Sequence, residues 1–257
     1  MREEPNESDF ASLAALVTIS GDFGVPTTNA IVGVVGTAFV LSDRVAVTAH
    51  HSVVQGFAPA DGPGSKSLWL VAEGHAPLRM RRSMVCLAPK QDAAEIALPK
   101  GWWTGPTLQT PVGSPEVNQP CFLAAYSMKQ FGAVVFSPAS LPRDPTLQSL
   151  DLVPMRGRFM GRIEAIDYEN HEYLPKFKAS ARFIRWTADT LKGMSGAPLI
   201  EVATGHVIGI HHAQSSEPGM LGGTAVLAGQ AVAISIIDAL YQIPERVTLG
   251  LAVAARV

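Results

Sequence analysis

Short apolar runs separated by turn residues are the main pattern of this sequence. From residue 12 onward, apolar and β-branched residues gather in short runs, and 23 glycines and 19 prolines supply breaks between them. This pattern is typical of the strands of an all-β barrel or sandwich. The expected strands are 15–19, 30–35, 37–41, 44–48, 121–125, 132–136, 161–166, 181–186, 198–200, 206–210 and 231–234. A single helix is expected over 235–241, where a capping serine opens the segment and a proline follows it.

The same pattern predicts how the chain is divided. We expect a polar tail over 1–11, a first β-barrel over 12–110, a second β-barrel with the helix over 111–242, and an apolar tail over 243–257. The Pro- and Gly-rich stretch 99–120 suits a connection between the two halves. A chain of 257 residues is long enough for two half-domains that share a core.

Composition and charge narrow the class of protein. Only 16% of the residues are charged, against about 25% in an average domain, which indicates a well-packed globular protein. The net charge of −2 and the lack of a basic stretch argue against nucleic acid as a partner. Cys86 and Cys121 are far apart in sequence, which favours two buried free thiols in a reducing compartment.

The N-terminal residues and the hydropathy predict a location. The chain begins with acidic and polar residues and lacks the basic start and apolar run of a secretory signal. No window reaches the ~18 apolar residues of a membrane span. We therefore expect a cytoplasmic protein with no membrane partner.

Three segments carry groups that nucleophilic acyl transfer needs. They are 47–51 (Val-Thr-Ala-His-His), 95–98 (Glu-Ile-Ala-Leu) and 193–198 (Gly-Met-Ser-Gly-Ala-Pro). A serine hydroxyl is a poor nucleophile until an imidazole takes its proton, and a carboxylate must hold that imidazole in the right tautomer. Each segment alone has a common structural explanation: a lone histidine, a solvated edge charge, or a Gly-Ser turn. Their conjunction in this order favours catalysis.

The serine lies in a turn of small residues. Gly193 and Gly196 flank Ser195 closely enough to permit a tight turn and the approach of a substrate carbonyl. The backbone N–H groups of Gly193 and Ser195 would then be free to converge on an oxyanion.

The histidine is either His50 or His51. Neighbours on an extended backbone point to opposite faces, so only one of them can reach the serine. The same alternation argues against a metal site built from the pair 50–51 or the pair 211–212. We expect no metal and no other cofactor.

The acid is either Glu95 or Asp92. Glu95 directly precedes the buried-looking segment 96–98, where its carboxylate would be partly desolvated and available to an imidazole. A solvated edge charge explains Glu95 equally well.

These segments together resemble the chymotrypsin-like serine peptidases, and most closely their disulfide-poor bacterial branch, which includes HtrA-type and glutamyl endopeptidases. The resemblance runs from about residue 12 to 242. It is carried by the segments 36–40 (Gly-Thr-Ala-Phe-Val), 48–53 (Thr-Ala-His-His-Ser-Val), 95–98, 189–198 and 207–211.

The resemblance implies two six-stranded antiparallel β-barrels with an active site between them. It also implies a serine endopeptidase that cleaves a protein or peptide substrate through an acyl-enzyme. Together with the location expected above, this predicts an intracellular enzyme. Ser195 would be the nucleophile, His51 the general base, and Glu95 the acid in place of the usual Asp, with Asp92 as the alternative. Gly193 and Ser195 would form the oxyanion hole.

Specificity and regulation stay open at this stage. By resemblance Asp189 matches the position that binds Arg or Lys in trypsin, whereas Thr190 and His211 match positions that bind a glutamate side chain. Of the two we favour a basic residue before the cleaved bond. Asp189 and Thr190 would also suit a structural turn. Met194 replaces the aspartate that pairs with a freed N-terminus in trypsin-type zymogens, so control would fall to a regulatory protein partner or the tails.

Two other classes of function compete with a peptidase. A catalytically weak or inactive protease-like binding module would hold a partner in the cleft or on the apolar tail. The glutamate at position 95, in place of the usual aspartate, keeps this alternative open. An esterase of the α/β type would need a Gly-x-Ser-x-Gly elbow before a helix. Gly196, Ala197 and Pro198 follow the serine instead, which argues against it.

Overall fold

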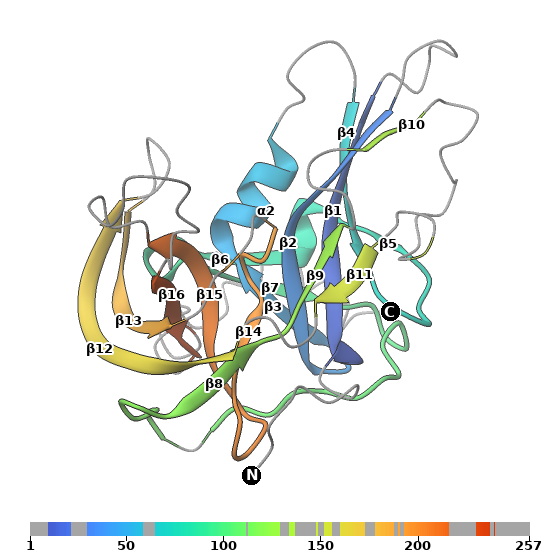
Figure 1. Ribbon diagram of the computed structural model, residues 1–257. Coiled ribbons are helices and arrows are strands. Elements are labelled where there is room, and N and C mark those ends of the chain that lie inside the picture. The colour runs from blue at the N-terminus through green and yellow to red at the C-terminus, as the bar shows by residue number, and fades with distance from the viewer. Residues whose placement is uncertain are drawn as a thin grey trace.

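The computed structural model of the chain describes residues 10–21, 30–58, 65–111, 113–128, 134–136, 148, 152–155, 160–172, 178–187, 190, 193–215, 230–236 and 239. These residues form two β-units, one from each half of the chain (Figure 1). The tail over 243–257 and nearly all of the tail over 1–11 lie outside them.

The first unit is a curled antiparallel sheet with the order β5-β4-β1-β2-β3-β7-β6. Its strands are β1 (Leu13–Gly21), β2 (Ala30–Ser42), β3 (Val45–Ala49), β4 (Ser65–Val71), β5 (Leu78–Arg79), β6 (Val85–Ala88) and β7 (Ala93–Ala97). The expected strands 30–35 and 37–41 are one strand, because Gly36 stays extended and pairs with Leu16 of β1. The helix α2 (His50–Phe57), which the sequence pattern did not predict, follows β3 directly. Two 3-10 turns, η1 (Arg82–Met84) and η2 (Pro89–Gln91), flank β6.

The second unit is a closed barrel of six strands in the order β12-β13-β16-β15-β14-β8. Its strands are β8 (Pro120–Leu123), β12 (Met160–Glu172), β13 (Lys178–Thr187), β14 (Pro198–Glu201), β15 (Val207–Ser215) and β16 (Gln230–Ser235). A separate two-stranded sheet pairs β9 (Ala125–Met128) with β11 (Leu152–Met155). Of the expected helix over 235–241, Ser235 ends β16, Ile236 and Ala239 are helical, and the others lie outside the described residues.

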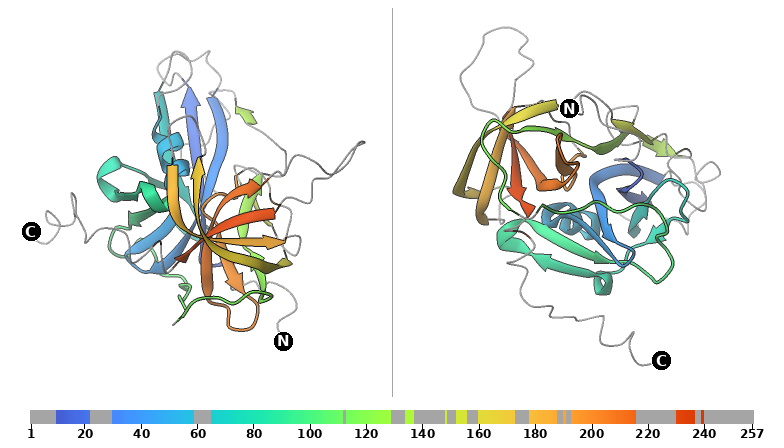
Figure 2. Two further views of the ribbon diagram at one scale, coloured as in Figure 1. Left: turned by 90° about the vertical axis from the view of Figure 1, so that its left-hand side faces the viewer. Right: turned by 90° about the horizontal axis from the view of Figure 1, so that it is seen from below.

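The first unit departs from the expected six-stranded barrel in its number of strands, and among the described residues only the second unit closes into a barrel. The closed barrel has six strands, whereas the path of the first sheet has seven and is joined by β10 (Val134–Phe136). The length of β2 explains the difference. One edge of β2 pairs with β1, while its other edge pairs with β10 at residues 30–32 and with β3 at residues 39–42. Figure 2 shows the two units from two further sides.

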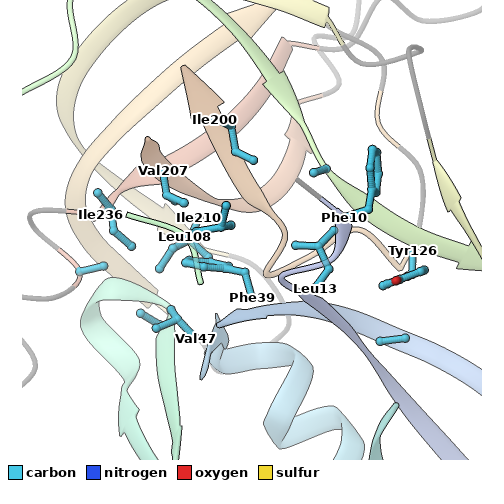
Figure 3. Close-up of a cluster of buried hydrophobic side chains, with 14 of the residues drawn as sticks. Phe10, Leu13, Phe39, Val47, Leu108, Tyr126, Ile200, Val207, Ile210 and Ile236 are labelled. Atoms are coloured by element: carbon cyan, nitrogen blue, oxygen red, sulfur yellow. The ribbon is translucent and has the colours of Figure 1, made fainter. Parts of the chain in front are cut away.

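One buried apolar cluster joins the two units. Phe39 and Val47 from the first sheet pack with Ile200 and Ile210 of the barrel and with Leu108 of the connection between β7 and β8 (Figure 3). Burial of such a side chain stabilises a fold by about 1.5–3 kcal/mol. The shared core therefore fixes where β3 ends relative to β14 and β15. Among the described residues no helix has the length and apolarity that crossing a bilayer would need.

Candidate active site

Asp92 caps helix α2 from the turn that precedes β7. The helix begins at His50, and its N-cap residue Ala49 makes no side-chain hydrogen bond to the helix. Because Ala49 pairs with Ala93 of β7, Asp92 lies beside the first turn of the helix. Its carbonyl accepts a hydrogen bond from the His50 N–H at 3.0 Å, and its Oδ1 accepts one from the His51 N–H at 2.9 Å. Two of the helix's unpaired N–H groups are thereby satisfied.

The carboxylate of Asp92 also binds two imidazoles. Its Oδ2 accepts hydrogen bonds from Nδ1 of His51, at 2.6 Å, and from Nδ1 of His212 on β15. An ionised carboxylate only accepts, so both histidines must carry their proton on Nδ1. With its proton on Nδ1, a neutral His51 carries its basic lone pair on Nε2, which is the atom that accepts the proton in a general base.

The surroundings keep Asp92 ionised. Burial alone would raise its pKa, but the hydrogen bonds from His212 and His51 and the charges of those histidines hold the pKa of Asp92 well below its usual range. The positive end of α2 acts in the same direction. The neighbouring His50 behaves differently: burial lowers the pKa of His50, although Oδ1 of Asp92 lies 3.8 Å from its Nδ1.

The turn around Ser195 is built on two glycines with left-handed backbone. Gly193 has φ +96 and Gly196 has φ +87, and a Cβ on Gly196 would collide with Thr48 Oγ1. The Ser195 carbonyl accepts a hydrogen bond from the Thr37 N–H at 2.9 Å, which ties the turn to β2 of the first sheet. The serine side chain is half-buried. The turn therefore lies at the junction of the two units.

His212 connects the serine to the acid. Its carbonyl accepts a hydrogen bond from Ser195 Oγ at 3.4 Å, while its ring binds Asp92. The rings of His51 and His212 meet edge to face with centroids 5.8 Å apart. Ser195, His212, Asp92 and His51 thus form one connected group. Sequence reasoning missed His212 because it considered this residue only as half of a candidate metal pair with His211.

The structure places Asp92, and not Glu95, at His51. Glu95 lies within β7, opposite Val47 and Cys86, and its side chain is half-buried. It is two residues further from α2 than Ala93, about 7 Å along the strand. Asp92 instead occupies a left-handed position, with φ +41, at the end of η2. That backbone conformation directs its side chain to the start of α2.

The alternation argument for the histidine pair was wrong. His50 and His51 begin a helix, where successive side chains do not lie on opposite faces as they do in a strand. Both lie near Asp92, and the 2.6 Å hydrogen bond from Nδ1 singles out His51.

The residues expected to line a substrate pocket are only partly described. Asp189 lies outside the described residues. Thr190 is buried, and the ring of His211 is buried edge-on to Trp186 with centroids 6.4 Å apart. Met194 is fully buried in the core of the barrel, as an apolar residue would be.

The histidine–aspartate cluster also has the residue types of a metal site. The ligand atoms of His51, Asp92 and His212 lie within 4.8 Å of one another. Tetrahedral ligands about 2.0–2.1 Å from a zinc ion lie roughly 3.3 Å apart. The 2.6 Å between His51 Nδ1 and Asp92 Oδ2 is shorter than that and fits a charge-assisted hydrogen bond.

Comparisons with known proteins find likenesses in structure and none in sequence. No family model matches the sequence, and no curated protein matches it. The structure resembles the Rv3671c protease of M. tuberculosis in its active form, with 16% identity, a TM-score of 0.56, and coverage of 92% of this chain and 81% of that chain.

Two further solved structures show the same likeness. Deg5 has 18% identity and a TM-score of 0.55, with coverage of 95% of this chain and 92% of that chain. The HtrA-type protease AlgW with a decapeptide has 17% identity and a TM-score of 0.56, and 91% of this chain spans 63% of it. The chain therefore has the double-barrel fold of the chymotrypsin-like serine proteases.

Proposed function

We propose that this protein is a serine endopeptidase whose nucleophile, general base and acid are Ser195, His51 and Asp92. The observation that carries the proposal is the 2.6 Å hydrogen bond between His51 and the buried Asp92, in a fold that holds Ser195 on a glycine turn with its hydroxyl bonded to His212. The family resemblance assigned the role of the acid to Glu95, with Asp92 as the alternative, and we now assign that role to Asp92.

The proposed reaction follows from the tautomer that Asp92 imposes. Ser195 Oγ attacks the scissile carbonyl carbon while its proton moves to Nε2 of His51. The ionised Asp92 stabilises the imidazolium, which then gives the proton to the departing amine. A water molecule, activated by the same imidazole, cleaves the resulting acyl-enzyme and frees Ser195. The N–H groups of Gly193 and Ser195 are the proposed oxyanion donors.

The proposal extends to substrate and location. We favour a basic residue before the cleaved bond, because the buried ring of His211 lies against Trp186 and is poorly exposed to bind a substrate carboxylate. Asp189 would then be the partner of that basic side chain. A cytoplasmic location, control by a protein partner and the absence of a cofactor complete the proposal.

A second function is favoured by the direction of the serine hydroxyl. Ser195 Oγ donates to the carbonyl of His212, and a hydroxyl in that bond is not donating to His51. A protease-like binding module would keep this arrangement permanently. In a peptidase the hydroxyl would turn to His51 when substrate binds, at the small cost of one weak 3.4 Å hydrogen bond.

A fluorophosphonate probe separates the two functions, because it reacts only with an activated serine. We expect covalent labelling of the wild type and none of Ser195→Ala, read by intact mass. Folded wild type that stays unlabelled across the pH range would reject the peptidase and support the binding module.

A further inference from the structure

His212 shares one oxygen of the acid with the proposed base. Both Nδ1 atoms donate to Oδ2 of Asp92, while Oδ1 accepts from the backbone N–H of His51. A carboxylate oxygen has two lone pairs, so His51 and His212 together use both lone pairs of Oδ2. The carboxyl group cannot rotate without breaking all three bonds at once. His212 therefore contributes to its orientation as directly as His51 does.

His212 is itself firmly placed. It lies on β15 of the closed barrel and is buried, with its ring tilted against Phe183 at a centroid distance of 5.5 Å. Its carbonyl accepts from Ser195 Oγ. One residue of the second unit therefore touches both the nucleophile and the acid, which comes from the first unit.

We propose that His212 is a positioning residue for the acid Asp92, and that it limits how strongly that carboxylate draws a proton onto His51. This inference rests on the proposed function and deepens it. A donor on Oδ2 withdraws charge from the carboxylate. Oδ2 of Asp92 then stabilises a protonated His51 with less negative charge than it would if His51 were the only imidazole bonded to it.

Few other charged groups face this carboxylate among the described residues. From α2, His50 lies 3.8 Å away, and burial lowers the pKa of His50, so it stays neutral. Lys90 of the adjoining turn η2 is exposed. On β13, which packs against η2, Arg182 donates to Ser114 and Arg185 pairs with the exposed Asp167. The two imidazoles thus dominate the surroundings of the acid.

A matched pair of variants isolates the hydrogen bond from the shape of the side chain. Asn and Leu have nearly the same outline, but only Asn can donate from the place of Nδ1. We expect His212→Leu to slow fluorophosphonate labelling by about 10- to 100-fold, the effect of one lost hydrogen bond to a charged group. We also expect the acidic midpoint of its pH–rate profile to rise. His212→Asn should recover most of the rate and lie nearer the wild-type midpoint.

The alternative is that His212 stabilises the fold and has no effect on the acid. In that case both variants would melt at a lower temperature yet label at the wild-type rate with the wild-type pH profile, and the inference would be overturned.

A second measurement needs no catalysis and keeps the two proposals separable. Proton NMR should show two far-downfield imidazole N–H resonances in the wild type and one in His212→Asn. If the wild type fails to label but shows both resonances, the peptidase proposal fails and the role of His212 in holding Asp92 stands. A wild type that is labelled but shows only one such resonance would reject the proposed role of His212 and leave the peptidase proposal standing.

Discussion

Replacing Asp92 by Asn is the sharpest test of the proposed acid. The aspartate accepts three hydrogen bonds through its side chain, one at Oδ1 and two at Oδ2. An asparagine offers one oxygen and one NH₂ group in the same outline. If its NH₂ replaces Oδ2, it faces two imidazole Nδ1 atoms and forces both histidines into the other tautomer. If it replaces Oδ1, it faces the His51 N–H.

The orientation with the asparagine NH₂ in place of Oδ2 removes the general base, because Nε2 of His51 would then carry the proton. The orientation with the NH₂ in place of Oδ1 brings two donors, this NH₂ and the His51 N–H, face to face at the start of α2. It also replaces the negative charge of the carboxylate by the dipole of an amide. Hydrogen bonds to charged groups contribute about 1.5–3 kcal/mol each, so losing two costs about 3–6 kcal/mol. At 1.36 kcal/mol per tenfold this is about 10²–10⁴ in rate. A change of aspartate to asparagine in a serine protease triad has an effect at the upper end of that range.

The assay is the second-order rate of fluorophosphonate labelling, checked with an activated ester substrate. Glu95→Gln is the matched control, since it makes the same chemical change on the adjoining strand, and it should label at nearly the wild-type rate. Rates are compared only for variants whose thermal transition lies well above the assay temperature. A large loss in Glu95→Gln with little loss in Asp92→Asn would return the acid to Glu95 and refute the reasoning.

Three further predictions follow from the same contacts. Gly36→Ala should lower the melting temperature and slow labelling, because its Cβ would lie 2.7 Å from the Ser195 carbonyl oxygen, whereas Gly113→Ala, which meets open space, should change neither. The fold holds the pKa of Asp92 below its ordinary value of about 3.9, so the ionised carboxylate stabilises the protein fully above that pH and progressively less below it. The free energy of unfolding by urea, measured from pH 7 down to pH 3, should therefore fall at the acidic end. In Asp92→Asn the part of this fall that is due to residue 92 should be absent. Burial raises the pKa of Cys121 to about 12, so this thiol should resist Ellman's reagent at pH 8 until the protein is unfolded; rapid modification of the native protein would contradict its burial.

The strands were predictable because their signals are local. Apolar runs with Gly and Pro breaks predicted the positions of most described strands and the all-β class. Cys86 and Cys121 are both free thiols as expected, but only Cys121 is buried, whereas Cys86 is half-buried. The helix α2 was not predictable in this way. It has eight residues and takes its cap from Asp92, which is 41 residues beyond His51. No capping residue precedes it in sequence.

The site was predictable only as far as its residues lie in recognisable segments. His51 and Ser195 were selected by their neighbours in sequence. The choice between Glu95 and Asp92 depended on a left-handed backbone at residue 92, which composition does not reveal. His212 depended on the barrel bringing β15 to η2 and α2, a contact between parts of the chain that are 120 residues apart.

The geometry of Asp92 explains why neighbouring carboxylates are not interchangeable here. Its Oδ1 binds the backbone of His51 and its Oδ2 binds the ring of the same residue, so one rigid group fixes both the start of the helix and the orientation of the imidazole. A carboxylate reaching in from Glu95 could orient the ring but would leave the His51 N–H without its side-chain cap. A substitution that removes the carboxylate of Asp92 therefore removes both the side-chain cap of α2 and the group that orients the base.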